Sequence, residues 1–148
     1  MKRAALLLTL AVVLTGCGSP AVDDDVTALT VGDCFDELEG SEVTSVPRVD
    51  CAEEHDFEVY AVVEMAADEF PGHDATVTEA GETCSEAFEV FLGLPYDDAL
   101  QGGYDFTSLY PTAESWKLGD REIVCSIAAT TPDGEIRPVT GTLKGAEQ

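Results

Sequence analysis

The chain has 148 residues, and its 30 Asp and Glu against 7 Lys and Arg give a formal net charge of −23 at pH 7. A chain of this length builds one hydrophobic core, so a single domain is expected. Its negative field repels phosphate backbones and anionic lipid headgroups, which excludes nucleic acid as a partner and electrostatic attachment to a membrane. A charged partner should be cationic, although acidic residues spread along a chain also serve solubility alone.

Residues 1–16 have the layout of a bacterial lipoprotein signal. Lys2 and Arg3 precede an apolar stretch (residues 4–14), and the motif Leu14-Thr15-Gly16-Cys17 follows. The stretch is too short for a membrane-spanning helix, which needs about 20 residues. Cleavage before Cys17 and attachment of lipid, such as palmitate, to Cys17 are therefore expected. An ordinary signal peptide whose cleavage happens to leave a cysteine is the alternative.

Lipid on Cys17 would place the protein on the extracytoplasmic face of the cell membrane. After cleavage, five basic residues would face all 30 acidic ones, a net charge of −25. Residues 17–28 have no hydrophobic periodicity and are interpreted as a flexible tether. Their run Asp23-Asp24-Asp25 lacks the glycine turn and distal Glu of an EF-hand loop, which favours a solvated spacer over a calcium site. The globular domain is expected over residues 29–145, with 146–148 as a tail.

The first half of this domain is predicted to form strands. Residues 29–31 and 43–49 are short candidates, the second of them interrupted by Pro47. Residues 57–65 are the clearest strand because apolar side chains alternate along them. The expected core face comprises Phe57, Val59, Ala61, Val63 and Met65. The opposite, partly wet face comprises Glu58, Tyr60, Val62 and Glu64.

One main helix is predicted after the loop at Pro71-Gly72. Thr76-Val77-Thr78-Glu79 has the form of a capping box, which places the start of the helix there. Gly93 and Pro95 are expected to end it. The apolar stripe follows at helical spacing and comprises Val77, Ala80, Cys84, Ala87, Phe88 and Phe91.

The second half is predicted to complete a sheet. Residues 97–103 are expected to form a loop, 104–110 a weak strand or irregular segment, and 111–119 a connection with at most one helical turn. Residues 121–129 are a second strong strand. Its apolar face should carry Ile123, Cys125, Ile127 and Ala129. Residues 139–143 are expected to form a last strand paired with this one.

These elements indicate an α+β fold, a small antiparallel sheet with one main helix packed on one face. Apart from Cys17, the four cysteines are an even number in an exported chain, so two disulfides are expected. Cys84 lies on the apolar stripe of the helix and Cys125 on the apolar face of a strand, which predicts Cys84–Cys125. Cys34–Cys51 follows by elimination.

Candidate chemistry is sparse. Two His-Asp pairs, His55-Asp56 and His73-Asp74, could together form a two-histidine, two-carboxylate metal site if their loops met, but surface histidines explain the pattern as well. Neither Ser85 nor Ser115 lies in a G-x-S-x-G elbow. No catalytic residues and no cofactor are therefore expected.

The only Trp lies in the segment Glu114-Ser115-Trp116-Lys117-Leu118-Gly119-Asp120-Arg121. Trp116 with Tyr110 and Tyr104 could form an aromatic surface for a glycan or protein partner, with Arg121 beside it. Alternatively, Trp116 closes one end of the core and Arg121 forms ion pairs with nearby carboxylates.

Several motifs occur together in the order typical of one family. They are Val31-Gly32-Asp33-Cys34-Phe35-Asp36, Cys51 followed by His55-Asp56, Cys84, and Trp116 with Gly119-Asp120-Arg121 before Cys125. In these motifs residues 29–145 resemble the septum formation domain of actinobacterial envelope proteins. One departure is Glu54, where Pro is expected.

Members of that family are exported and tethered to the membrane, and they have no established catalytic residues. The resemblance implies a non-enzymatic envelope lipoprotein that binds an envelope protein or a cell-wall polymer in septum formation. The alternative is a metal-binding or metal-sensing surface protein that uses His55, Asp56, His73 and Asp74.

Overall fold

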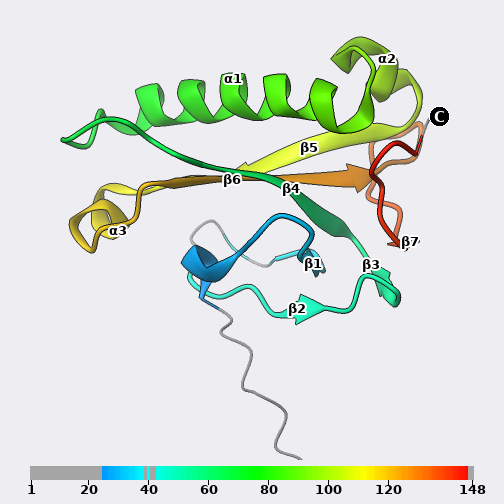
Figure 1. Cartoon of the computed structure of the whole chain (residues 1–148), viewed down its shortest axis with the longest axis horizontal. Helices are drawn as coiled ribbons and strands as arrows, with labels where there is room; N and C mark the ends of the chain where they lie inside the picture. Colours follow the sequence, from blue (N-terminus) through cyan, green and yellow to red (C-terminus); the bar gives the residue numbers. More distant parts are fainter. Residues whose placement is uncertain (1–24, 39, 41–42, 147–148) are drawn as a thin grey trace, which may run out of the picture.

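The computed structural model describes residues 25–38, 40 and 43–146. The predicted signal, Cys17 and residues 18–24 of the tether lie outside the described residues. A five-stranded antiparallel sheet in the order β2-β1-β4-β6-β5 is covered on one face by helix α1 (Figure 1). Its strands are β1 (Cys34–Phe35), β2 (Arg48–Val49), β4 (Phe57–Glu64), β5 (Tyr104–Leu109) and β6 (Glu122–Ala129). The predicted α+β class is confirmed.

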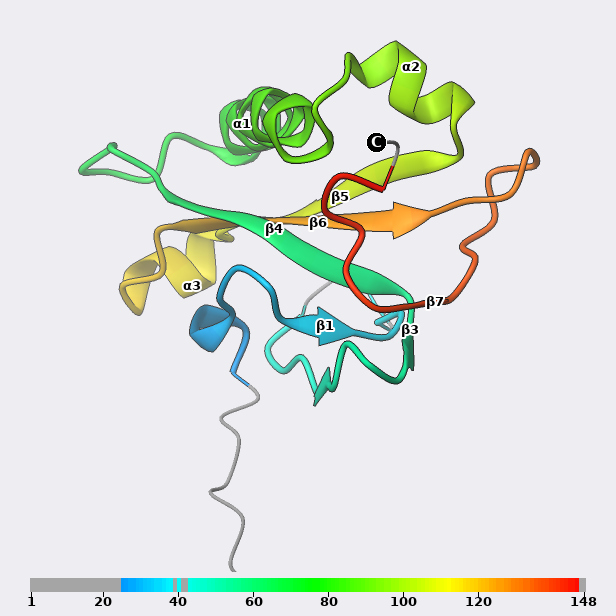
Figure 2. The ribbon, with the colours of Figure 1, turned by 45° about the vertical axis from the view of Figure 1, so that its right-hand side comes forward.

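Smaller elements surround this sheet. A second sheet pairs β3 (Glu54–His55) with β7 (Val139–Thr140). The helices are η1 (Val26–Ala28), a 3-10 turn, α1 (His73–Leu92), α2 (Tyr96–Gln101) and α3 (Ala113–Lys117). When the molecule is turned by 45°, α1 lies on one side of the sheet and η1 on the other (Figure 2).

Strand β6 is the centre of the core. All seven residues from Ile123 to Ala129 are buried, because both faces of the sheet are covered. Ile123, Cys125 and Ile127 pack in the cluster that contains the α1 residues, as the alternation predicts. Val124 and Ala128 pack in a second cluster on the opposite face, with Phe35 and Val59 among its members. The two faces of the sheet therefore bury separate cores.

A β-bulge in β4 makes the predicted division of its faces wrong. Val59 pairs with Ser126 and Ala61 with Cys125, so that Tyr60 is an extra residue without a counterpart in β6. Such an insertion shifts the alternation by one. Phe57 and Val59 consequently belong to the cluster away from α1, whereas Tyr60 packs against α1 and donates a hydrogen bond of 2.8 Å to the Cys84 carbonyl.

Helix α1 begins one turn earlier than the capping box predicts. Its first residue is His73 and Thr76 lies inside it, where the Thr76 hydroxyl donates to the Gly72 carbonyl at 3.0 Å. The predicted end at Gly93 is confirmed, with φ of 81°, a conformation that glycine adopts at little cost. The buried stripe has strict four-residue spacing and comprises Thr76, Ala80, Cys84, Phe88 and Leu92. Val77, predicted to be on it, is 40% exposed.

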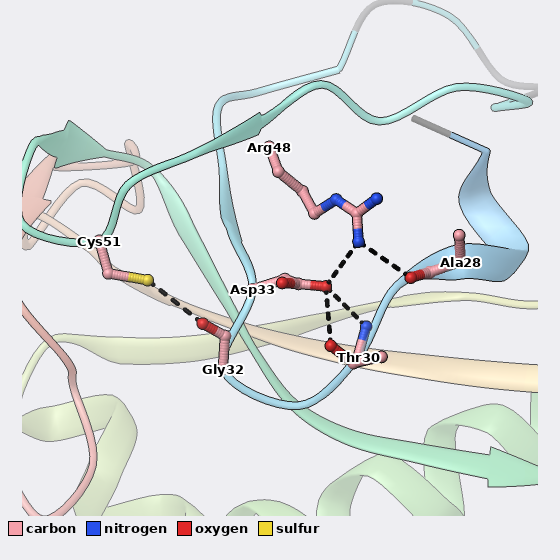
Figure 3. A network of polar contacts seen from close by, with 6 residues as sticks. All are labelled: Ala28, Thr30, Gly32, Asp33, Arg48 and Cys51. Carbon is pink, nitrogen blue, oxygen red and sulfur yellow. Dashed lines mark hydrogen bonds and ion pairs between the residues drawn. The ribbon is translucent and has the colours of Figure 1, made fainter. Parts of the chain in front are cut away.

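The N-terminal segment is fastened by a polar network instead of the strand predicted at residues 29–31. Gly32, with φ of 93°, closes a turn, and the Gly32 amide donates to the Val59 carbonyl at 2.8 Å. The Asp33 carboxylate accepts both the amide and the hydroxyl of Thr30, at 2.7 and 3.0 Å, and pairs with Arg48 at 3.3 Å (Figure 3). Arg48 also donates to the Ala28 carbonyl at 3.0 Å. The network thus links the turn to the chain at β2.

Two C-terminal predictions are wrong. Residues 96–101 form α2 in place of a loop, and the Pro95 carbonyl accepts the Ala99 amide at 3.0 Å at the start of this helix. The last strand is β7, and it pairs with β3 rather than with β6. The buried Glu58 carboxylate holds the segment after β7 in place, since it accepts hydrogen bonds from the Leu143 amide at 2.6 Å and the Thr142 hydroxyl at 2.7 Å. The strand at 104–110 and the single helical turn within 111–119 are confirmed as β5 and α3.

Both predicted disulfides are present. Cys34–Cys51 joins β1 to the turn after β2, and Cys84–Cys125 joins α1 to β6. Cys51 Sγ lies 3.3 Å from the Gly32 carbonyl oxygen (Figure 3), which is a contact rather than a hydrogen bond because a disulfide sulfur carries no proton. The two bridges fasten the N-terminal segment and the helix to the sheet independently.

Candidate functional site

A groove of about 780 Å³ lies beside α3. We call it the α3 groove. The end of β5, the start of β6, the first turn of α1 and the N-terminal segment contribute its other walls. Its apolar lining includes Phe70, Leu109, Tyr110, Leu118 and Val124, and its carboxylates are Asp25, Glu114, Asp120 and Glu122. None of the described lining residues is Lys or Arg. The groove therefore combines an apolar surface with negative charge.

The α3 wall is held by the segment that the sequence singles out. The Thr112 hydroxyl accepts the Ser115 amide at 3.1 Å and the Ser115 hydroxyl accepts the Thr112 amide at 2.9 Å, a reciprocal cap that fixes the start of α3. Trp116 is only 6% exposed and its ring packs 5.7 Å from that of Phe70. Trp116 thus closes this end of the core.

Arg121 stabilises the same wall through its contact with the Trp116 ring. Its guanidinium carbon lies 3.7 Å from the ring centroid, and Nη1 donates to the carbonyls of Trp116 and Asp120 at 2.8 and 2.7 Å. Arg121 therefore binds backbone carbonyls, where an ion pair with carboxylates was expected. Gly119, with φ of 103°, makes the tight return of the chain possible.

The three aromatic residues of the predicted surface are not brought together. Tyr110 lines the α3 groove, with its ring 6.2 Å from that of His73. Trp116 is buried in the core and does not line the groove, and Tyr104 is at the opposite end of β5. A partner-binding role for Trp116, Tyr110 and Arg121 stays a prediction, and of the three Tyr110 is the one that lines the groove.

Glu122 is the least compensated carboxylate of the groove. Its Oε2 is buried and has no hydrogen-bond partner among the residues that the structure describes. Burial, together with the nearby Asp120 and Glu64, raises the pKa of the Glu122 carboxyl above its usual value. Asp120 is held in place because its Oδ1 accepts the Glu122 amide at 3.1 Å. Glu114 pairs with Lys117 at 3.9 Å, but both side chains are exposed, so this pair offsets little of the charge.

The Glu122→Gln variant is expected to melt at a higher temperature than the parent at pH 7.5. A carboxyl with a raised pKa in the folded state binds protons more readily there than in the unfolded chain, so its ionised form costs stability above that pKa. The cost disappears as the pH falls through the folded-state pKa. Melting curves at pH 7.5 and pH 4 should therefore differ between variant and parent only at the higher pH, and an equal difference at both would contradict the assignment.

The four residues of the alternative metal site are not brought together. His55 is 1% exposed on β3, with Nδ1 3.0 Å from the Glu53 carbonyl, and Asp56 accepts the Glu37 amide at 2.9 Å. His73 and Asp74 are exposed at the start of α1, at the other end of the molecule from β3 (Figure 1). Within residues 25–38, 40 and 43–146, no group of three or more His, Cys, Asp or Glu is placed to hold a metal ion.

The sequence reasoning missed most of the groove. The sequence marks Asp120 only as part of a family motif and gives no role to Glu122 or to Leu118, although Leu118 is 90% exposed in the groove lining. Leu118 stands between Lys117 and Gly119, and an apolar residue in such a polar turn is a signal that could have been used. Ser108 at the end of β5 carries no sequence signal at all.

The structure defines a small α+β domain with two internal disulfides, and disulfides suggest a domain that works outside the cytoplasm. Residues 18–148 match the family model described as septum formation, and the chain belongs to that family. No curated protein and no solved structure matches the chain. No helix within the described part of the chain is long and apolar enough to cross a membrane.

Proposed function

We propose that the protein is a non-enzymatic lipoprotein, anchored through Cys17 on the extracytoplasmic face of the cell membrane, that binds an envelope protein or cell-wall partner in septum formation. The family supports the link to septum formation. The two disulfides support an oxidising compartment. The Leu14-Thr15-Gly16-Cys17 motif supports the anchor.

The α3 groove is the observation that carries the binding role. It combines an exposed apolar side chain, Leu118, with a rigid wall built by Trp116 and Arg121. Exposed apolar surface beside a fixed scaffold is typical of interaction sites. The Ser115 hydroxyl is engaged in the cap of α3, which favours a structural role for this serine over a nucleophilic one.

A photo-crosslinking amino acid at position 118, introduced in living cells, is expected to yield a specific adduct. Leu118 is 90% exposed in the groove. Val90 is 85% exposed near the C-terminal end of α1 and does not line the groove, so it is the matched control. The adduct should form in dividing cells, be recovered in the membrane fraction, and be absent when position 90 carries the crosslinker.

Two outcomes would overturn this assignment. One is an adduct of the same composition from both positions, which would indicate random collisions. The other is no adduct from position 118 in dividing cells. A Cys17→Ser variant tests the anchor in the same preparation, because it should move the protein from the membrane fraction to the soluble fraction.

A further inference from the structure

Strand β5 is an edge of the main sheet. It pairs with β6 on one side, and in the order β2-β1-β4-β6-β5 no strand of the described residues lies on its other side. An edge strand presents backbone N–H and C=O groups that can pair with another chain, so folded proteins usually block it. Backbone groups on the outer side of β5 that are not hydrogen-bonded therefore indicate where another chain can pair.

Two hydrogen bonds establish which β5 residues point outward. The Gly103 carbonyl accepts the Thr130 amide at 2.7 Å, so the residue before β5 faces inward, toward the chain that continues β6. The Phe106 amide instead donates to the Asp105 carboxylate at 2.8 Å. Since inward and outward residues alternate in an antiparallel ladder, Ser108 directs its N–H and C=O to the outer edge.

The outer edge is blocked in its first half and open in its second. The Asp105 carboxylate accepts a hydrogen bond from the Phe106 amide, and the Tyr96 hydroxyl from α2 donates to the same carboxylate oxygen at 3.0 Å. Ser108 and Tyr110 instead line the α3 groove. Beyond them, the Thr112 amide is engaged by Ser115. The open stretch of the edge thus faces the groove.

The charge of the α3 groove indicates which kind of partner can bind there. The groove contains Asp25, Glu114, Asp120 and Glu122 and no Lys or Arg among its described lining residues. A second copy of this chain is a poor occupant, because each copy carries 30 acidic residues against 7 basic ones. A segment with alternating basic and apolar side chains complements the carboxylates with one face and Leu109, Leu118 and Val124 with the other.

We propose that the α3 groove receives a basic, extended segment of a partner protein, which adds as a short strand to the edge of β5 at Ser108. This inference rests on the proposed binding function and names the partner's chemistry. Backbone pairing with Ser108 supplies the hydrogen bonds, and the groove carboxylates select positive charge.

The first test uses the full chain in detergent micelles and the peptide Lys-Val-Lys-Val-Lys-Val, with binding measured by calorimetry. Binding should weaken roughly tenfold between low and high salt, because the charges are solvent-accessible. It should be lost with Glu in place of Lys. It should also fall about tenfold or more when the three central peptide bonds are N-methylated, since these cannot donate to an edge strand.

The second test changes the protein. Ser108→Pro removes an outward N–H that the ladder with β6 does not use, so proline is tolerated there while the edge is closed. We expect binding of the basic peptide to fall about tenfold or more, with Ser108→Ala within about twofold of the parent. In the parent, amide hydrogen exchange at Ser108 should slow when the peptide binds. If Ser108→Pro fails to fold, the N-methylated peptide and the exchange measurement still decide.

The outcomes separate this inference from the proposed function. Peptide binding that leaves exchange at Ser108 unchanged, or that survives N-methylation, overturns strand addition. Equal binding of the acidic peptide overturns the charge assignment, and dimers held together through Ser108 would identify a second copy as the occupant. If the peptide does not bind but position 118 still yields its adduct in cells, the inference fails and the proposed function stands. Loss of that adduct defeats the proposed function.

Discussion

Replacement of both Cys84 and Cys125 by alanine is expected to lower the free energy of unfolding by about 4 kcal/mol. The bridge spans a sequence separation of 41 residues and joins α1 to the central strand β6. Without it, the unfolded chain gains the freedom of a long loop. Both cysteines are fully buried, so the native state also loses packed sulfur atoms. For a domain of this size the melting temperature should fall by about 15 °C, measurable by circular dichroism.

The Cys34→Ala and Cys51→Ala pair is the matched control. Its sequence separation is 17, which predicts a smaller loss of about 3 kcal/mol. The N-terminal segment keeps its Arg48–Asp33 contact in this variant. If the two double variants melted at the temperature of the parent, the view that the bridges compensate for the repulsion among 30 acidic residues would be wrong.

The sheet, the main helix and the Cys84–Cys125 disulfide follow from the sequence because they depend on periodicity, and Cys34–Cys51 then follows by elimination. Cys84 lies on a stripe that recurs every four residues, and Cys125 alternates with polar and apolar neighbours on a strand. These patterns place both sulfurs between helix and sheet whatever the exact bounds of the elements. The end of α1 follows as well, because Gly93 and Pro95 act locally.

The bulge in β4 and the partner of β7 depend on tertiary contacts instead. Nothing in Phe57–Glu64 marks Tyr60 as an inserted residue, since its position is set by the buried hydrogen bond to the Cys84 carbonyl. Similarly, β7 lies beside β3 because Glu58 binds the backbone at Leu143, a contact between residues 85 positions apart. Local sequence propensity therefore cannot predict the bulge or the pairing of β7 with β3.

Only the α3 wall of the candidate site could be predicted from the sequence. The motif from Trp116 to Arg121 is distinctive in sequence, and the structure uses it to build the α3 wall. The groove itself forms where five segments meet, and its carboxylates are ordinary acidic residues in a chain that contains 30 of them. Which of those gather on one surface is a property of the fold. The same holds for the open edge at Ser108.

The Trp116→Ala variant is expected to lose about 3–5 kcal/mol of stability, the usual cost of removing a large buried aromatic side chain. The ring contacts both Phe70 and the Arg121 guanidinium, at distances of 5.7 and 3.7 Å. Its loss therefore leaves a cavity and removes the ring contact of the Arg121 guanidinium. Urea unfolding followed by circular dichroism measures the change, and amide exchange at Leu118 and Gly119 should accelerate because the α3 wall loosens.

Two further variants make this result specific. Trp116→Phe keeps part of the ring contact and should recover roughly half of the lost stability. Val90→Ala, at a side chain 85% exposed on α1, should change stability by less than about 0.5 kcal/mol. A Trp116→Ala protein that unfolded at the same urea concentration as the parent, yet no longer formed the adduct at position 118, would favour the opposite interpretation. Trp116 would then contact the partner directly, and the α3 wall would need another source of rigidity.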